Sequence, residues 1–122
     1  MAFKSLDLSP FARGDTWTTK FTLTDSSNTP LDITGFTYWL TLKINQDDAD
    51  PGVAQQSVLA TGTDATNGIV YITFQPSVTY TLTPRRYYYD LQQVDPTSGS
   101  PTQITTLLIG KVKVATDITR TA

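Results

Sequence analysis

The chain has 122 residues and a formal net charge of −2 at pH 7, and it contains neither Cys nor His. It therefore has no disulfide framework, no thiolate metal ligand and no imidazole, the commonest general base near neutral pH. Its nine Lys and Arg residues are scattered along the sequence, so the charge pattern of a nucleic-acid binder is missing.

Residues 1–12 are predicted to form an N-terminal arm without the apolar run of a secretion signal. A strand is expected over residues 16–24, because Trp17, Phe21 and Leu23 alternate with threonines in the pattern of a half-buried strand. Thr makes up about a fifth of the chain, and all eleven acidic residues are Asp. This composition favours strands and turns over helices.

The clearest alternation covers residues 36–44 and predicts a strand with Tyr38, Leu40 and Leu42 on its buried side. Trp39 falls on the opposite, polar side of the same strand. A polar loop that ends in Pro-Gly follows it.

Four further strands are predicted, each bounded by turn residues such as Gly, Pro, Asn and Asp. They cover residues 56–61, 69–75, 86–94 and 103–115. The turn before the second of them ends in Asn67-Gly68, a pair that accepts positive φ angles. One short helical turn is expected near residues 76–82, because this segment starts with Pro. Gly110 in the last strand predicts a bulge or bend, and residues 116–122 are expected to be a C-terminal tail.

Six or seven short strands at this spacing predict one all-β domain over residues 1–122, with at most one helical turn. The best match is a single antiparallel β-sandwich of immunoglobulin-like character, and a jelly-roll-like sandwich or a small barrel is the alternative. Leu82 with Tyr87 or Tyr88 could form a tyrosine corner, in which a Tyr near the start of a late strand bonds back to the backbone. The alternative is that these Tyr are ordinary strand residues.

Two loops suggest ligand binding, and for both the plainer interpretation is favoured. Residues 13–15 spell the receptor-binding tripeptide Arg-Gly-Asp, but Gly also suits a turn that leads into a strand. Asp47, Asp48 and Asp50 could together hold a hard cation such as Ca²⁺. Because the closing acid of an EF-hand is missing, a solvated loop without metal is predicted.

Residues 85–89 read Arg-Arg-Tyr-Tyr-Tyr, a mixture that also occurs on platforms for single-stranded nucleic acid. Two arginines are too few to follow a phosphate backbone, and consecutive Tyr on a strand point to alternate faces. A protein interface is the favoured interpretation, and it extends to Trp39, because exposed Trp and Tyr are enriched at interfaces. For Trp39 the alternative is burial under a second sheet. The candidate interface consists of Trp39, Tyr88, Arg85 and Arg86.

The sequence predicts no catalytic site, no cofactor and no metal site. Ser and Thr are plentiful, but only Asp or Lys could activate them, and no pair of Asp residues stands out as a glycosidase pair. No apolar run approaches the ~20 residues that a membrane helix needs. A protein that is not an enzyme, and that has no nucleic-acid or membrane partner, is therefore expected.

Several short motifs follow one another over nearly the whole chain, residues 13–120. Arg-Gly-Asp-Thr-Trp opens a Thr-rich strand, and Pro-Leu-Asp-Ile-Thr-Gly-Phe starts at residue 30. Asn-Gly follows at residue 67, Leu-Thr-Pro at residue 82, Tyr-Tyr-Asp-Leu-Gln at residue 88 and Leu-Ile-Gly-Lys-Val-Lys-Val at residue 108. This order resembles a family of small tailed-bacteriophage and prophage structural proteins with immunoglobulin-like β-sandwich domains, similar to the N-terminal domains of baseplate and tail-fibre proteins.

The resemblance implies a non-catalytic structural or assembly protein of a tail, a baseplate or a head accessory. Its partners would be further copies of itself, as a homo-oligomer, and other phage structural proteins. It would lie in the virion, and in the bacterial host cytoplasm during assembly. The resemblance assigns no binding residues, and the Arg-Arg-Tyr stretch departs from it where a short Pro-Gly corner is expected. A carbohydrate- or receptor-binding module is the alternative function.

Overall fold

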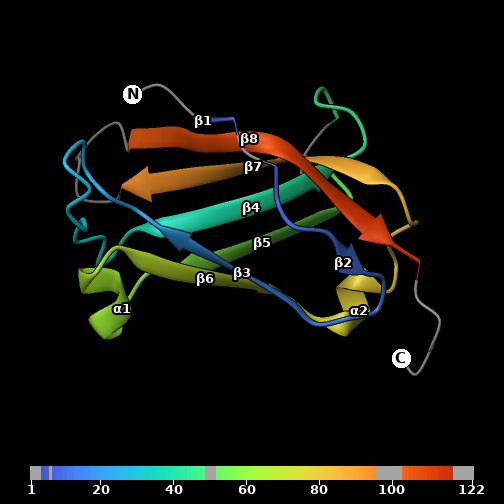
Figure 1. Ribbon diagram of the computed structural model, residues 1–122, viewed down its shortest axis with the longest axis horizontal. Helices are drawn as coiled ribbons and strands as arrows, with labels where there is room; N and C mark the ends of the chain where they lie inside the picture. Colours follow the sequence, from blue (N-terminus) through green and yellow to red (C-terminus); the bar gives the residue numbers. More distant parts are fainter. Residues whose placement is uncertain (1–3, 6, 49–51, 96–102, 117–122) are drawn as a thin grey trace.

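The computed structural model of the protein describes residues 4–5, 7–48, 52–95 and 103–116. Within these residues the chain forms eight strands and two short helices, coloured in sequence order in Figure 1. The strands are β1 (Lys4–Ser5), β2 (Phe11–Ala12), β3 (Trp17–Thr22), β4 (Thr37–Lys43), β5 (Ala54–Leu59), β6 (Ile69–Phe74), β7 (Arg86–Asp95) and β8 (Gln103–Ala115), and the helices are α1 (Gly62–Thr66) and α2 (Pro76–Thr79). No helix in this described part of the chain is long and apolar enough to span a membrane.

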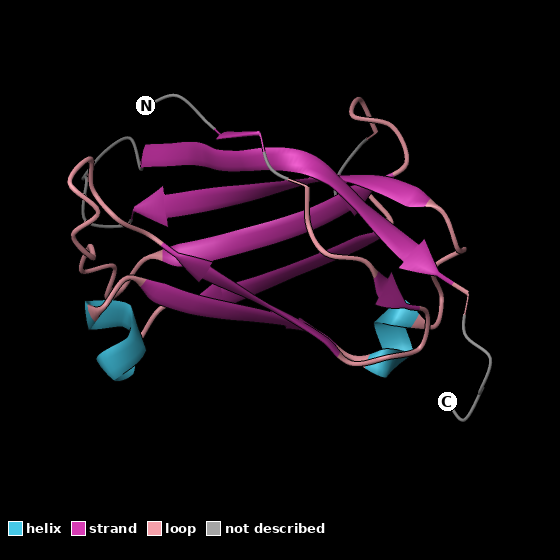
Figure 2. Cartoon of the chain, viewed as in Figure 1, coloured by secondary structure: helices cyan, strands magenta, loops and turns pink. Residues whose placement is uncertain are grey.

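The strands form two sheets, and Figure 2 shows the larger one curled over the smaller. The large sheet has the order β1-β8-β7-β4-β5, with β2 as a further partner of β8, and the small sheet consists of β3 and β6. The prediction of a mostly β-stranded chain is confirmed. The prediction of a purely antiparallel arrangement is wrong for the N-terminal segment, because β1 and β2 run alongside β8 in the same direction.

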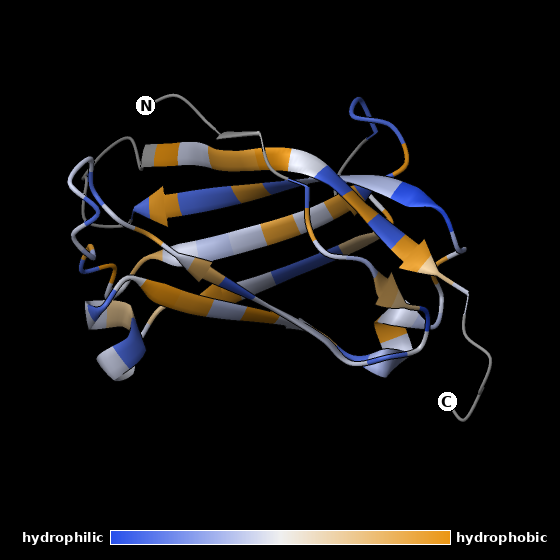
Figure 3. Cartoon of the chain, viewed as in Figure 1, coloured by the Kyte–Doolittle hydropathy of each residue, from blue (hydrophilic) through white to orange (hydrophobic). Residues whose placement is uncertain are grey.

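The alternation predicted for residues 36–44 decides where the core lies. Tyr38, Leu40 and Leu42 are fully buried, whereas Trp39 is 36% exposed on the outer face of the large sheet. Because successive side chains of a strand point to opposite faces, this one strand contributes to both the core and the outer surface. Figure 3 shows the alternation as bands of hydrophobic and hydrophilic residues along the strands.

An aromatic stack joins the two sheets. The ring of Phe11 on β2 stacks on Trp17 of β3 with 4.3 Å between the ring centroids, and Trp17 stacks on Phe74 of β6 at 5.5 Å. β2 is hydrogen-bonded to β8 of the large sheet, so Phe11 connects this sheet to the small one. The predicted N-terminal arm thus follows β8, and the backbone N–H of Leu8 donates a bond of 2.9 Å to the carbonyl of Lys111.

Tyr87 forms the predicted tyrosine corner. Its hydroxyl group donates a hydrogen bond of 2.6 Å to the backbone carbonyl of Thr83, and Leu82 in the same corner is buried. Tyr88, the other candidate, points to the opposite face of β7. The bond fixes the path of the chain into β7 after α2, which is the helical turn expected near residues 76–82.

The prediction of at most one helical turn is wrong, because residues 62–68 contain α1 and not a simple turn. Ala65 is fully buried, and its carbonyl accepts a hydrogen bond of 3.0 Å from the backbone N–H of Ile33. Packing of this small side chain winds the segment into a helical turn, and such tertiary packing overrides the local preference of the sequence. β5 likewise covers Ala54–Leu59 and not the predicted residues 56–61.

The irregularity predicted at Gly110 lies instead at Leu107. The pairing between β7 and β8 shifts register between Leu91 and Gln92, which leaves Leu107 as the extra residue of a bulge. Gly110 itself is paired in register. The extra residue lets two consecutive apolar side chains, Leu107 and Leu108, both pack toward the core, which a regular strand does not allow.

Gly68 is expected to tolerate no side chain. Its φ angle is +74°, and a Cβ atom at this position would lie 2.3 Å from the carbonyl oxygen of Leu23. We expect Gly68→Ala to lower the free energy of unfolding by more than ~1 kcal/mol, because it adds a steric collision to the strain of the positive φ angle. Urea denaturation measures this change.

Gly35→Ala is the matched control. Gly35 has a φ angle of +89°, but no atom beyond its two chain neighbours lies within 4 Å of the position that its Cβ would take. This variant suffers the backbone strain without the collision, so it should lose clearly less stability than Gly68→Ala. Equal losses in the two variants would contradict the role assigned to the close approach of Leu23.

Candidate functional site

The outer face of the large sheet carries three of the four residues predicted to form an interface. Trp39 on β4 and both Tyr88 and Arg86 on β7 point to this face, because the residues that alternate with them are buried. Trp39 is paired with Gln92 of β7, whereas Tyr88 lies further along the strand, opposite Lys43. The predicted interface is therefore divided into two places on one face.

One of these places carries three basic residues, and we name Arg86, Tyr88, Lys111 and Lys113 the cationic end. The carboxylate of Asp7 lies beside Lys111, whose backbone N–H donates a hydrogen bond of 3.1 Å to Asp7 Oδ1, so the positive charge without an acid beside it is that of Arg86 and Lys113. Arg86 is paired with Lys113 across β7 and β8, and Tyr88 is paired with Lys111. The ammonium nitrogen of Lys111 lies 5.4 Å from the ring centroid of Tyr88. Neither Arg86 nor Lys113 has an acidic partner among the residues that the structure describes. Because like charges directly opposite each other destabilise a sheet, this pairing costs the isolated chain stability.

The other place is a groove beside Trp39, with a volume of about 260 Å³. It is lined by Trp39, Thr41, Gln55, Asp90, Gln92, Val94 and Ile104. The register explains this set, because Trp39 has Gln92 directly beside it on β7, and Thr41 lies between Gln55 of β5 and Asp90 of β7. The Nε2 atom of Gln55 donates a hydrogen bond of 3.0 Å to Oγ1 of Thr41. We name this feature the Trp39 groove.

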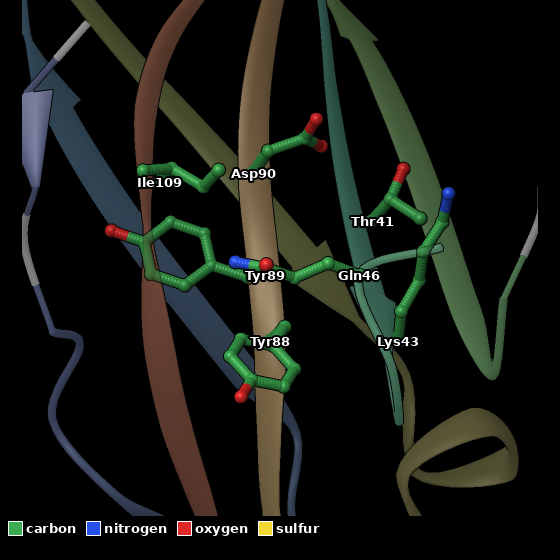
Figure 4. Close-up of a pocket in the computed structure, with 7 residues that line it drawn as sticks. All are labelled: Thr41, Lys43, Gln46, Tyr88, Tyr89, Asp90 and Ile109. Atoms are coloured by element: carbon green, nitrogen blue, oxygen red, sulfur yellow. The ribbon is translucent and has the colours of Figure 1, made fainter. Parts of the chain in front are cut away.

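A smaller pocket of about 60 Å³ lies between the Trp39 groove and the cationic end. Figure 4 shows its lining residues, with Tyr88 and Asp90 on β7 between Ile109 of β8 and Thr41 of β4. Gln46 reaches across this part of the face from the loop after β4 (Figure 4). Thr41 and Asp90 line both the pocket and the groove, so the two depressions adjoin.

Two arginines of the sequence motifs are held against tyrosine rings. The guanidinium carbon of Arg13 lies 4.5 Å from the ring centroid of Tyr80, and its Nε donates a hydrogen bond of 2.9 Å to the carbonyl of the same residue. The guanidinium carbon of Arg85 lies 5.7 Å from the ring centroid of Tyr87. These contacts support the interpretation of residues 13–15 as a structural turn, since the arginine of the tripeptide packs within the fold.

The Asp-rich loop is only partly described. The Oδ2 atom of Asp48 accepts a hydrogen bond of 3.0 Å from the backbone N–H of Asn45, which closes the turn after β4. Asp50 lies outside the described residues. In the part of the chain that is described, no group of three acidic, His or Cys side chains is placed to hold a metal ion.

Lys111, Lys113 and Gln92 lie outside the predicted interface set. The Lys-Val-Lys alternation in β8 places both lysines on one face, so this part of the cationic end could be predicted from the sequence. The position of Arg86 beside Lys113 could not be predicted in this way, because it depends on the register between β7 and β8. The position of Gln92 beside Trp39 likewise depends on register, here between β4 and β7.

Burial raises the pKa of three phenol groups in the core. It raises the pKa of Tyr89 to about 12, with a smaller contribution from the charge of Asp7. It raises the pKa of Tyr38 further still, and the Tyr38 hydroxyl donates a bond of 2.7 Å to Oε1 of Gln93. The pKa of Tyr87 is also raised by burial, although the nearby charge of Arg85 acts in the opposite direction.

These shifts predict a loss of stability at alkaline pH. Because the phenols bind their protons more tightly in the folded state, their stabilising effect is complete below pH ~10 and is lost as the pH rises through about 12. The urea midpoint should therefore fall steeply over this range, and it should fall less in Tyr38→Phe. Tyr71→Phe, at a position 45% exposed, should behave like the unmodified protein. A midpoint that stays constant up to pH 12 would contradict this account.

Comparison of the chain with protein-family models and with curated protein sequences gives no match. The resemblance to small tailed-phage proteins therefore stays a prediction from the sequence.

Proposed function

We propose that the protein is a non-catalytic structural component of a tailed-phage or prophage particle, in the tail, the baseplate or a head accessory. It acts through protein–protein contacts with further copies of itself and with other structural proteins of the particle. The phage context of this proposal rests on the resemblance of the sequence motifs. The observation that supports a protein–protein contact is the cationic end, where Arg86 is paired with Lys113 without an acidic partner in the described part of the fold.

The strand order supports an immunoglobulin-like β-sandwich as the scaffold. In such a fold, strands three, six and seven of a seven-stranded chain form one sheet, strands two and five belong to the other, and a tyrosine corner marks the sixth strand. If β3 is taken as strand two, strands three, six and seven are β4, β7 and β8, which are neighbours in the large sheet. Strands two and five are then β3 and β6, which pair in the small sheet. Tyr87 supplies the corner at the start of β7.

The electrostatics of the cationic end favour an acidic protein partner. Repulsion between Arg86 and Lys113 is a cost that the free chain carries, and carboxylates of a partner placed over the pair would relieve it. Complementary charges of this kind fix the orientation of a partner and accelerate its association more than they add raw affinity. A particle built from many copies needs such orientation at every contact.

The opposite end of the molecule carries the complementary charge. The end of β3, the start of β4 and the helix α1 lie together at the end of the sheets away from α2, as Figure 1 shows. Asp25, Asp32 and Asp64 occupy this end. Hydrogen bonds from the hydroxyl and backbone N–H of Thr34 lower the pKa of Asp32, which keeps its carboxylate charged. Head-to-tail contact between copies is therefore favoured, and such contacts close into rings when the rotation allows it.

The proposal predicts an oligomer that depends on salt. Light scattering after size exclusion should show a defined oligomer at low ionic strength and a shift toward monomer at high ionic strength, because salt screens exposed charges. Replacing both basic residues, Arg86→Glu with Lys113→Glu, should give a monomer even at low salt. Lys20→Glu, at an exposed position of β3, is the control with the same type of charge change and should assemble normally.

A monomer at every concentration and salt condition would contradict head-to-tail self-assembly. Membership of a particle is tested separately, by mass spectrometry of purified phage or induced prophage particles from the source host. We expect the chain to be present in stoichiometric amounts relative to other structural proteins. Its absence from particles that are otherwise complete would contradict the structural role.

A further inference from the structure

The side chain of Trp39 is partly exposed and does not contribute to the core. It lies in the interior of the large sheet, on the face turned away from the core, and it is 36% exposed. The core gains nothing from this indole, since Tyr38 and Leu40 on either side of it fill the inner face. A large aromatic surface that is left open in the middle of a polar sheet face is typical of a binding site.

The polar groups around the indole are fixed by the strands. Gln92 is the direct cross-strand neighbour of Trp39, and its side-chain amide has no hydrogen-bond partner among the described residues. The amide of Gln55 is oriented by the bond from its Nε2 to Thr41, which leaves its Oε1 as an acceptor at the groove. Hydrogen-bonding groups held by regular strands lose little freedom when a ligand binds.

The charge of the lining restricts the ligand class. Asp90 is the one ionisable side chain among the groove's lining residues, and none of them is a Lys or an Arg. An anionic ligand such as a phosphate or an acidic peptide is therefore disfavoured. The groove offers one aromatic surface, two amides, a hydroxyl and a carboxylate, flanked by Val94 and Ile104.

A sugar ring matches this set of groups. It has an apolar C–H face that packs on an aromatic ring, and hydroxyl groups that each donate and accept hydrogen bonds. Amide and carboxylate side chains can each satisfy more than one hydroxyl. The groove is small and open, which suits one or two rings of a longer chain that continues over the face.

We propose that the Trp39 groove binds an uncharged oligosaccharide or polysaccharide chain, with the indole of Trp39 as the stacking surface and Gln92, Gln55 and Asp90 as the hydrogen-bonding groups. This site goes beyond the structural role. It is also separate from the cationic end, because neither Arg86 nor Lys113 lines the groove. A component of a particle could therefore use one part of the face for assembly and another for a glycan.

The experiment is affinity electrophoresis of the full chain in native gels that contain soluble β-glucan, xylan, galactan or mannan, with polygalacturonate as the anionic comparison. At least one neutral polysaccharide should retard the protein, and polygalacturonate should not. A fluorescence titration with oligosaccharides of the retarding polymer then gives the affinity. Trp39→Ala should weaken binding at least about tenfold, as expected for a central aromatic contact.

Gln92→Ala provides a second variant, since removal of a half-buried amide on the outer face leaves the core intact, and it should weaken binding severalfold. The matched control is Tyr71→Ala, which removes an aromatic side chain of 45% exposure from β6 of the small sheet. It should bind like the unmodified protein. Urea denaturation of every variant shows that the fold is retained.

Failure to bind any of the four neutral polymers would overturn the inference, and so would binding that survives Trp39→Ala in a folded variant. A Trp39→Ala variant that changes the oligomer mass without affecting sugar binding would assign the groove to a protein contact instead. These outcomes are independent of the salt-dependent assembly, which is read from mass and from substitutions at the cationic end.

Discussion

The fold depends on how a large, curled sheet is covered by only two strands. The small sheet of β3 and β6 is too narrow to shield the whole inner face, so the N-terminal segment completes the cover. Phe11 does this by stacking on Trp17, which in turn stacks on Phe74, while its own strand is bonded to β8. Buried apolar surface is the main favourable term in folding, and this stack closes the core at the point where the two sheets would otherwise separate.

The need for an apolar inner face on the large sheet also explains why its outer face is available for function. Because the inner face of β4 and β7 must be apolar, strict alternation sends every second residue outward, where packing does not restrict its identity. One end of this outer face carries an indole among amides, and the other carries paired cations around Tyr88. Four neighbouring strands, β5, β4, β7 and β8, thus support two chemically different surfaces on one sheet, and no loop contributes a key group to either of them.

Sequence reasoning was most reliable where one strand's own alternation decides the outcome. It placed Tyr38 inside and Trp39 on the opposite face, with burial of Trp39 left open, and it offered Tyr87 as one of two candidates for the corner. It was wrong where distant segments decide, as in the helical turn around the buried Ala65 and the parallel docking of the N-terminal segment. The candidate site divides in the same way. Trp39 follows from periodicity, but the Gln92 beside it follows from register, which no local pattern contains.

The docking of β2 on β8 joins the beginning of the described fold to its end, with Phe11 paired to Val114. Contacts between residues so far apart in sequence form slowly, because the closure entropy of the intervening chain must be overcome first. On the ribosome, β3, β4, β5 and β6 can pair or pack before β8 has emerged, but β2 cannot pair until β8 is made. Trp17 can stack on Phe74 as soon as β3 and β6 pair, but Phe11 can take its place in the stack only after β8 is made. Until then, the ring of Phe11 and the face of Trp17 that it covers stay exposed to any chaperone or neighbouring chain.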